Sequence, residues 1–171
     1  TATTAVTNTA LGMHSMRLTT TGSDNVAVGH EALDKNTTGG NNTAVGKSAL
    51  IANTTASFNT AVGDKAMQTN TTGTNNTAIG HQALNKNTTG GLNTGLGLNA
   101  LYNNTTASNN TAVGHSALFA NTTGDINTAV GRDALKSNTT ASSNNAFGRE
   151  ALRDNTTGTN NTAMGAFALD A

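Results

Sequence analysis

The sequence predicts an all-β fold, a parallel β-solenoid (β-roll) of ten 17-residue coils that forms one tandem-repeat domain over residues 1–171. The first observation behind this prediction is a strict period. The phrase Asn-Thr-Ala-Val-Gly, or a close variant, recurs every 17 residues with no insertion or deletion. A short period without slippage means that each unit stacks on the unit before it. The coils begin at ten asparagines: Asn8, Asn25, Asn42, Asn59, Asn76, Asn93, Asn110, Asn127, Asn144 and Asn161.

The second observation is the composition of the repeat, whose 17 columns we number from that asparagine. The consensus is Asn-Thr-Ala-Val-Gly-x-x-Ala-Leu-x-x-Asn-Thr-Thr-(Gly/Ala)-x-x. Column four is always apolar, column nine is always Leu or Met, and columns three and eight are Ala almost throughout. Columns six, seven, ten and eleven vary and carry nearly all the charge. The constant columns therefore predict the structural core of each coil.

The same columns favour strands over helices. A 17-residue unit is too short for a helical solenoid repeat, which needs about 33 residues, and Asn, Thr and Gly are poor helix formers. Alternating Thr and Val suit a strand, and Asn and Gly suit turns. We expect two short strands per coil, at columns two to four and twelve to fourteen. Coils about 4.8 Å apart would make a rod about 48 Å long.

Asparagine in column one and glycine in column five both have a structural interpretation. Stacked asparagines can hydrogen-bond in a ladder, with the amide donating to one neighbour and accepting from the other; binding of a ligand by this column is the alternative. Glycine in column five indicates a positive φ or a contact too close for a Cβ atom. The predicted turn glycines are Gly29, Gly46, Gly63, Gly80, Gly97, Gly114, Gly131 and Gly148.

Apolar residues in neighbouring columns predict self-association. Successive residues of a strand point to opposite faces, so columns three and four, and likewise eight and nine, should be apolar on both faces. One coil can bury only one face inside itself, and the other would leave an apolar stripe along the rod. The alternative is a flattened coil in which both sets turn inward near a bend.

The phrase Asn-Thr-Ala-Val-Gly-x-x-Ala, as at residues 42–49, 76–83 and 110–117, resembles the YadA-like head repeat of trimeric autotransporter adhesins. Similar repeats occur in phage-type tail fibres and bacterial surface proteins. The resemblance implies a left-handed parallel β-roll, three copies of which pack around a threefold axis. The Asn-Thr-Thr segment of each unit, such as residues 36–38, is not part of the head repeat, whose usual unit is shorter.

Composition argues against several classes of function. Nine basic and nine acidic residues give zero net charge, so no nucleic-acid partner is expected. No apolar run approaches the length of a membrane span, and the absence of Cys excludes disulfides and thiolate metal sites. Three of the four histidines share column six but lie two or three coils apart: His30, His81 and His115. We therefore predict no catalytic, cofactor or metal site and no enzymatic activity.

The Asn-Thr-Thr segment has three interpretations. It is a hydrogen-bonded turn and ladder, a set of glycan acceptors, or part of a flat Thr/Asn face that binds glycans or ice. Each Asn of the segment is formally an acceptor triplet. These candidates are Asn36, Asn53, Asn70, Asn87, Asn104, Asn121, Asn138 and Asn155, and further triplets begin at Asn41, Asn75, Asn103, Asn109 and Asn160.

Together these patterns predict a structural extracellular rod, filament or adhesin-fibre segment at a cell or virion surface. Its expected partner is itself, by end-to-end stacking, because the two ends of the sequence lie at nearly the same repeat phase, or by side-by-side trimerisation. The alternative is a binding module that presents the Thr/Asn face to host-surface glycans or ice.

Overall fold

The computed structural model of the chain describes residues 4–170. Every regular element in this range is a strand of three residues, and ten such strands form one sheet in chain order. The strands are β1 (Thr9–Leu11), β2 (Val26–Val28), β3 (Thr43–Val45), β4 (Thr60–Val62), β5 (Thr77–Ile79), β6 (Thr94–Leu96), β7 (Thr111–Val113), β8 (Thr128–Val130), β9 (Asn145–Phe147) and β10 (Thr162–Met164). The predicted all-β solenoid with a 17-residue spacing is confirmed.

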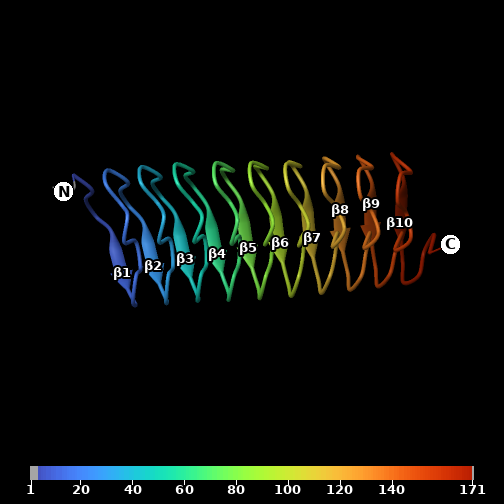
Figure 1. Cartoon of the computed structure of the whole chain (residues 1–171). Coiled ribbons are helices and arrows are strands. Elements are labelled where there is room, and N and C mark those ends of the chain that lie inside the picture. Colours follow the sequence, from blue (N-terminus) through green and yellow to red (C-terminus); the bar gives the residue numbers. More distant parts are fainter. Residues whose placement is uncertain (1–3, 171) are drawn as a thin grey trace.

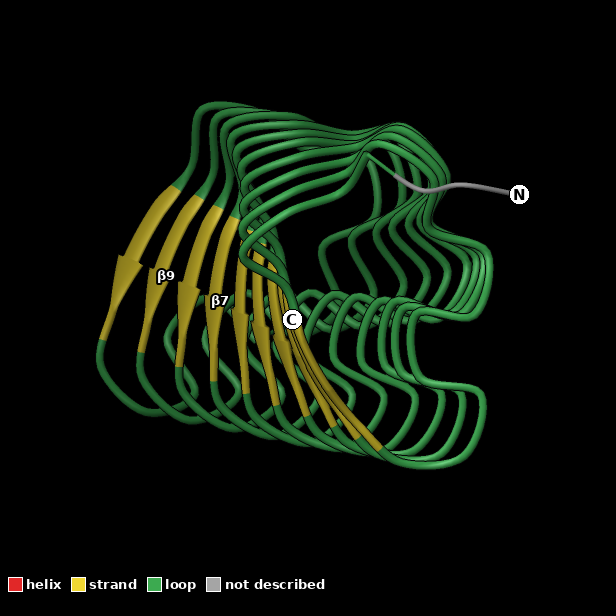
Figure 2. Cartoon of the chain, turned by 90° about the vertical axis from the view of Figure 1, so that its left-hand side faces the viewer, coloured by secondary structure: helices red, strands yellow, loops and turns green. Residues whose placement is uncertain are grey.

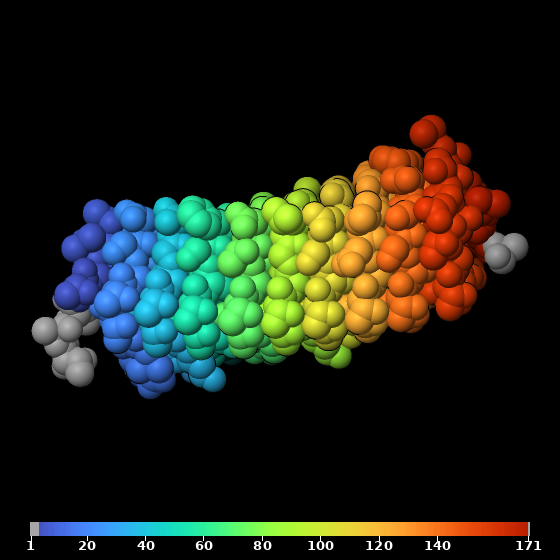
Figure 3. All heavy atoms as spheres, turned by 90° about the horizontal axis from the view of Figure 1, so that it is seen from above, coloured from blue at the N-terminus to red at the C-terminus, as the bar shows by residue number. Residues whose placement is uncertain are grey.

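All strand pairs are parallel and in register with the sequence repeat. Ala44 pairs with Ala61 and Val45 with Val62, each 17 residues further along the chain. The strands lie side by side along a rod, with β1 and β10 at opposite ends (Figure 1). Viewed along the rod, they form one wall, and turns and irregular segments close each coil (Figure 2). The space-filling view shows successive coils in contact along one side of the rod (Figure 3).

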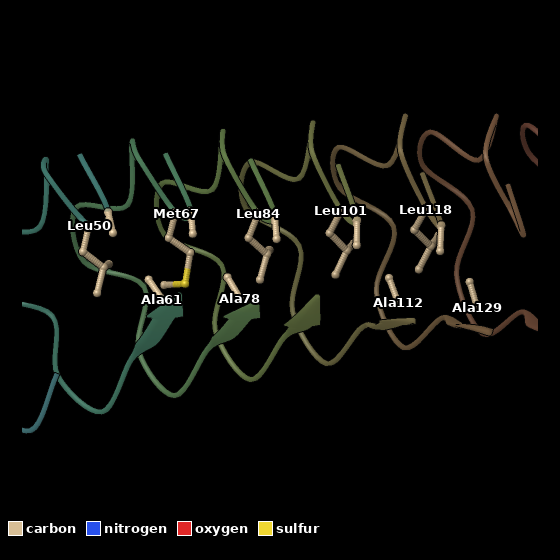
Figure 4. Packing of buried hydrophobic residues seen from close by; sticks show 14 of the residues in the cluster. Leu50, Ala61, Met67, Ala78, Leu84, Leu101, Ala112, Leu118 and Ala129 are labelled. Carbon is tan, nitrogen blue, oxygen red and sulfur yellow. The ribbon is translucent and has the colours of Figure 1, made fainter. Parts of the chain in front are cut away.

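The interior is narrow because small residues face large ones across it. Column-three alanines such as Ala44 are fully buried, whereas Thr43 and Val45 on either side are partly exposed, as strand alternation requires. Column-nine side chains point across the coil toward these alanines (Figure 4). A Cβ atom built on Gly95, which replaces Ala in its column, would lie 3.4 Å from Leu84 Cγ. The core is therefore a row of leucines, replaced by Met16 and Met67 in two coils, that packs against alanines.

The expectation that columns eight and nine face opposite ways is wrong. Ala83 and Leu84 are both fully buried. The backbone explains this, because Gln82 and Leu84 have φ of +57° and +51°, in the left-handed region. Two left-handed residues bend the chain so that both apolar side chains turn inward. For columns eight and nine this arrangement matches the flattened-coil alternative. Of columns three, four, eight and nine, only column four then faces outward.

The expected second strand at columns twelve to fourteen is also wrong. These segments do stack, but Thr37 N and Thr38 N both donate to the same carbonyl oxygen, that of Thr54, at 2.8 and 3.2 Å. A parallel ladder instead needs alternate residues to bond to different carbonyls. The segment is therefore a stacked turn, and each coil has one strand. Residues 4–170 contain no helix with the length and apolarity needed to cross a membrane.

Candidate functional site

The column-one asparagines lie inside the coil as a hydrogen-bonded ladder. Asn42 is almost completely buried. Its Nδ2 donates to Asn25 Oδ1 at 3.1 Å and to Ala56 O at 2.9 Å. Its backbone N also donates to Asn25 Oδ1, and its own Oδ1 accepts from Asn59 N at 3.0 Å. Because the polar atoms of this buried side chain bond within the stack, the column holds successive coils together.

A second ladder runs through column twelve. Asn70 Nδ2 donates to Asn53 Oδ1 at 3.2 Å and to Gly73 O at 2.9 Å. The same pair of bonds recurs for most of the eight glycan-acceptor candidates, Asn53, Asn70, Asn87, Asn104, Asn121, Asn138 and Asn155, while Asn36 Nδ2 bonds to the carbonyl oxygen of Gly39. All but Asn155 are fully buried.

This burial bears directly on glycosylation. An N-linked glycan attaches to Nδ2, and in the folded column-twelve residues that nitrogen is buried and donates its hydrogen bonds inside the coil. A glycan there would break the ladder, so in the folded chain the column has a structural role. Asn41, Asn75, Asn109 and Asn160, in column seventeen, are exposed and each begins an acceptor triplet. Asn103, the remaining triplet, is half-buried, and its Nδ2 donates to Phe119 O at 3.1 Å. Column seventeen therefore holds the exposed acceptor asparagines of the folded rod.

The column-five glycines occupy backbone positions closed to other residues. All ten have φ between +123° and +139°. A Cβ atom on Gly80 would lie 2.5 Å from the carbonyl oxygen of Gly97 in the next coil. Both the conformation and the close approach of successive coils therefore require glycine at this corner.

Threonine occupies three different environments in each coil. Column-two threonines lie on the outer side of the strand wall, partly exposed in most coils. Column-thirteen hydroxyls bond between coils: Thr71 Oγ1 donates to Thr88 O at 3.0 Å, and Thr88 Oγ1 donates to Thr105 O at 2.9 Å. Column-fourteen side chains are exposed in every coil: Thr21, Thr38, Thr55, Thr72, Thr89, Thr106, Thr123, Thr140 and Thr157. The expected mixed Thr/Asn face therefore reduces to one exposed threonine column, since the asparagines beside it lie inside.

The outer side of the strand wall carries a column of apolar side chains beside the column-two threonines. Its column-four side chains form what we call the apolar stripe: Leu11, Val28, Val45, Val62, Ile79, Leu96, Val113, Val130, Phe147 and Met164. These side chains are half-buried or exposed in every coil. Because β-branched and large apolar side chains repeat in register, the stripe runs the length of the rod. Contiguous apolar surface of this kind is uncommon on monomeric proteins.

A second apolar feature stands at column seventeen, at the corner before each strand. Phe58, Leu92 and Ile126, which we call the apolar ridge, occupy alternate coils and are 59%, 61% and 61% exposed. Their φ angles are +60°, +58° and +59°. Large side chains strain the left-handed region, whereas Asn tolerates it, and Asn does occupy column seventeen in the intervening coils. The ridge is therefore both strained and exposed.

The charged columns form ion pairs toward the C-terminal end of the rod. Arg132 Nε and Lys136 Nζ lie 2.9 and 3.0 Å from the carboxylate of Asp133, which is almost fully buried. Burial of Asp133 opposes its ionisation, but hydrogen bonds from Lys136 and Arg132 outweigh that effect and hold the pKa of the carboxyl below its usual value. These pairs therefore favour the folded chain above acidic pH.

A similar cluster follows in the next coil. Glu150 is bound by Arg149 at 2.9 Å and Arg153 at 2.8 Å. Arg153 also pairs with Asp154 at 3.0 Å. The hydrogen bond between these two side chains raises the pKa of Arg153 and lowers the pKa of Asp154. The arrangement pairs the nearly buried carboxylate of Glu150 with two arginines.

One cluster of metal-ligating side chains was not predicted from the sequence. His14, His30 and Glu31 each offer a ligand atom, and these atoms all lie within 4.8 Å of one another. The two histidines come from different columns of adjacent coils, so that a comparison within column six did not find them. The usable signal was their separation of 16 residues in the sequence, one less than the period, which places them diagonally across a coil boundary.

Comparison with protein-family models, curated proteins and solved structures finds no match for this chain. The resemblance to YadA-like head repeats therefore rests on the motif alone, and the function has to be inferred from the surfaces described above.

Proposed function

We propose that the chain is a structural rod, a segment of an extracellular filament or adhesin fibre at a cell or virion surface, which works by self-association and without catalysis. The observation that carries the proposal is the use of its polar side chains. Asparagine and threonine dominate the repeat, and in columns one, twelve and thirteen they bond coil to coil. Side chains used in this way extend and stiffen a rod, because every added coil repeats the same bonds.

The apolar stripe and the apolar ridge support side-by-side association. Ile126 combines a β-branched side chain, a left-handed backbone and 61% exposure. In an isolated rod this combination is unfavourable twice, through backbone strain and through hydration of the side chain. Burial against a second copy would offset both costs. The same argument applies to Phe58 and Leu92, which share this left-handed conformation and high exposure.

Stacking along the axis is the second mode of assembly that we propose. An open hollow of about 340 Å³ at the first coil is lined by residues that include Asn8, Met16 and Arg17. Within the rod, Arg17 pairs with Asp34 in the next coil at 3.0 Å, and Arg153 lies 3.2 Å from Asp170. A further coil stacked on either end, from more chain or from another copy, would continue the same column pattern.

The experiment for side-by-side association replaces the ridge with the residue that its column already accepts. Phe58→Asn, Leu92→Asn and Ile126→Asn would be combined in one variant and compared with wild type by sedimentation velocity and electron microscopy. Wild type should form multimers, and the variant should dissociate without losing thermal stability. A wild type that stays monomeric at all concentrations, or a variant with unchanged assembly, would contradict the proposal.

The matched control changes the exposed threonine column in the same three coils: Thr55→Asn, Thr89→Asn and Thr123→Asn. This variant should assemble as wild type does. It also tests the second candidate function, a module that binds host-surface glycans or ice, which the unbroken row of exposed column-fourteen side chains favours. Loss of hemagglutination, host-cell binding or ice-growth inhibition in the threonine variant, with assembly unchanged, would support the binding module. A wild type without these activities would exclude it.

A further inference from the structure

We propose that His14, His30 and Glu31 form a binding site for a divalent transition-metal ion, Zn²⁺, which clamps the first coil to the second. The site does not depend on the proposed structural function. Two imidazoles and a carboxylate are a ligand set that Zn²⁺ takes in proteins, with a fourth position left to water. Imidazole ligands also favour Zn²⁺ over the oxygen-seeking Mg²⁺ and Ca²⁺.

The geometry places the three groups close to coordination distance. Their ligand atoms lie within 4.8 Å of one another, the two imidazole centroids are 6.2 Å apart, and His30 Nδ1 lies 3.6 Å from Glu31 Oε2. Ligands of a tetrahedral zinc site stand about 3.3 Å apart, given bonds of about 2.0–2.1 Å. Small side-chain rotations would therefore complete the site, since all three side chains are at least partly exposed.

The backbone beneath the site is held in place. Glu31 N donates to Met13 O at 2.9 Å across the coil boundary, and His14 and Glu31 share the same left-handed conformation, with φ of +60° and +58°. Ser48 Oγ donates to Glu31 Oε2 at 3.2 Å. A hydroxyl bonded to a metal-ligating carboxylate orients it, as outer-shell partners do in zinc sites. The site thus has ligands from two coils and a supporting contact from a third.

The same two columns in other coils give a contrast. In Arg132–Asp133 and in Arg149–Glu150, a column-six arginine forms an ion pair with the column-seven carboxylate at 2.9 Å. At Glu31 the column-six neighbour is His30, which is itself one of the three proposed ligands. His81 lies 3.3 Å from Asp64 but has no third ligand, because within residues 4–170 the only group of three metal-ligating side chains is the one proposed. These other histidines provide internal controls.

The binding test titrates the wild-type chain with Zn²⁺ and follows histidine imidazole signals by NMR and heat by calorimetry. One equivalent should bind, and the signals of His14 and His30 should shift before those of the other histidines. His14→Gln, His30→Gln and Glu31→Gln should each weaken binding by at least about 10-fold, since loss of even an outer-shell partner weakens metal affinity by about 10- to 100-fold. The control, His115→Gln, should bind as wild type does.

A second readout tests the clamp itself. The first strand is exposed along its whole length, so its amides should exchange with solvent readily. A metal held by both coils stabilises the closed state by mass action, so exchange of residues 9–18 should slow by about 100-fold when Zn²⁺ is present at a hundred times its dissociation constant. The proposal is overturned if His14→Gln or His30→Gln binds Zn²⁺ as wild type does, if the control loses binding equally, or if bound Zn²⁺ leaves this exchange unchanged.

Discussion

Removing one side chain from the column-one ladder should weaken the rod at a known point. Asn76 and Asn93 are both fully buried. Asn76 Oδ1 accepts from Asn93 N at 2.9 Å, and Asn76 Nδ2 donates to Gly90 O at 2.8 Å. In Asn76→Ala the backbone N–H of Asn93, which is fully buried, would lose its acceptor. Gly90 O would keep its second donor, Asn87 Nδ2.

The magnitude follows from these bonds. A buried N–H left without a partner costs about 1–3 kcal/mol, and the lost bond to a carbonyl that remains satisfied costs about 0.5–1.5 kcal/mol. The sum is about 1.5–4.5 kcal/mol in the free energy of unfolding, with a middle value of about 3 kcal/mol. For a chain of this length, about 3 kcal/mol corresponds to a fall in the thermal midpoint of about 6–12 °C.

The assay is thermal unfolding by circular dichroism, with hydrogen exchange of residues 86–95 to locate the defect. The control is Asn75→Ser at the adjacent exposed position, where Ser143 occupies the same column with φ of +60°. The control should melt within about 2 °C of wild type, since surface changes are usually worth less than about 0.5 kcal/mol. Equal midpoints for Asn76→Ala and the control would refute the reasoning that the ladder stabilises the stack.

Three further predictions concern single columns. Leu84→Asp places an unpaired charge in the core and should cost at least about 4 kcal/mol in unfolding free energy. The control, Lys86→Asp at an exposed position, should cost less than about 1 kcal/mol. Chemical denaturation measures both, and equal tolerance of the two changes would contradict the column assignment. Gly80→Ala meets the carbonyl oxygen of Gly97 at a positive φ and should cost at least about 2–3 kcal/mol by the same assay; a wild-type midpoint would exclude the close approach of the coils at this corner as the reason for glycine. Asp133→Asn should lower the thermal midpoint near neutral pH, and this difference from wild type should persist down to about pH 4 and then disappear. The reason is that the pKa of the carboxyl is lowered in the folded chain, so its ionised form is stabilising until the pH falls through that value. A difference in midpoint that does not depend on pH would contradict the ion-pair account.

The fold was predictable from the sequence because identical columns must stack in a repeat without slippage. The period placed Ala44 opposite Ala61 and Gly80 beside Gly97, and the structure pairs or stacks them in that way. Glycine in column five also carried a direct signal of positive φ. Strand position was predictable too, since alternating Thr and Val in columns two to four indicated a strand, and Thr43–Val45 is one.

The path of the chain between the corners was not predictable, because left-handed residues there are not glycines. Gln82 and Leu84 have positive φ, yet neither residue type signals it, and strand alternation then assigns the wrong faces to columns eight and nine. The metal-ligand group was missed for a related reason. Contacts between different columns, such as His14 with His30, depend on that path and not on the period.

The left-handed positions also bear on the proposed assembly. Leu84 and Ile126 have φ of +51° and +59°, so both carry the strain of a large residue in the left-handed region. Leu84 is fully buried, and its burial in the core offsets the strain; Ile126 is 61% exposed and gains nothing comparable within its own rod. Asparagine at Ile126 would relieve the strain and remove the exposed apolar surface together. A residue that weakens the isolated rod in two ways is best explained by a contact outside it, which is why assembly, and not stability alone, is the property that the ridge variant should change.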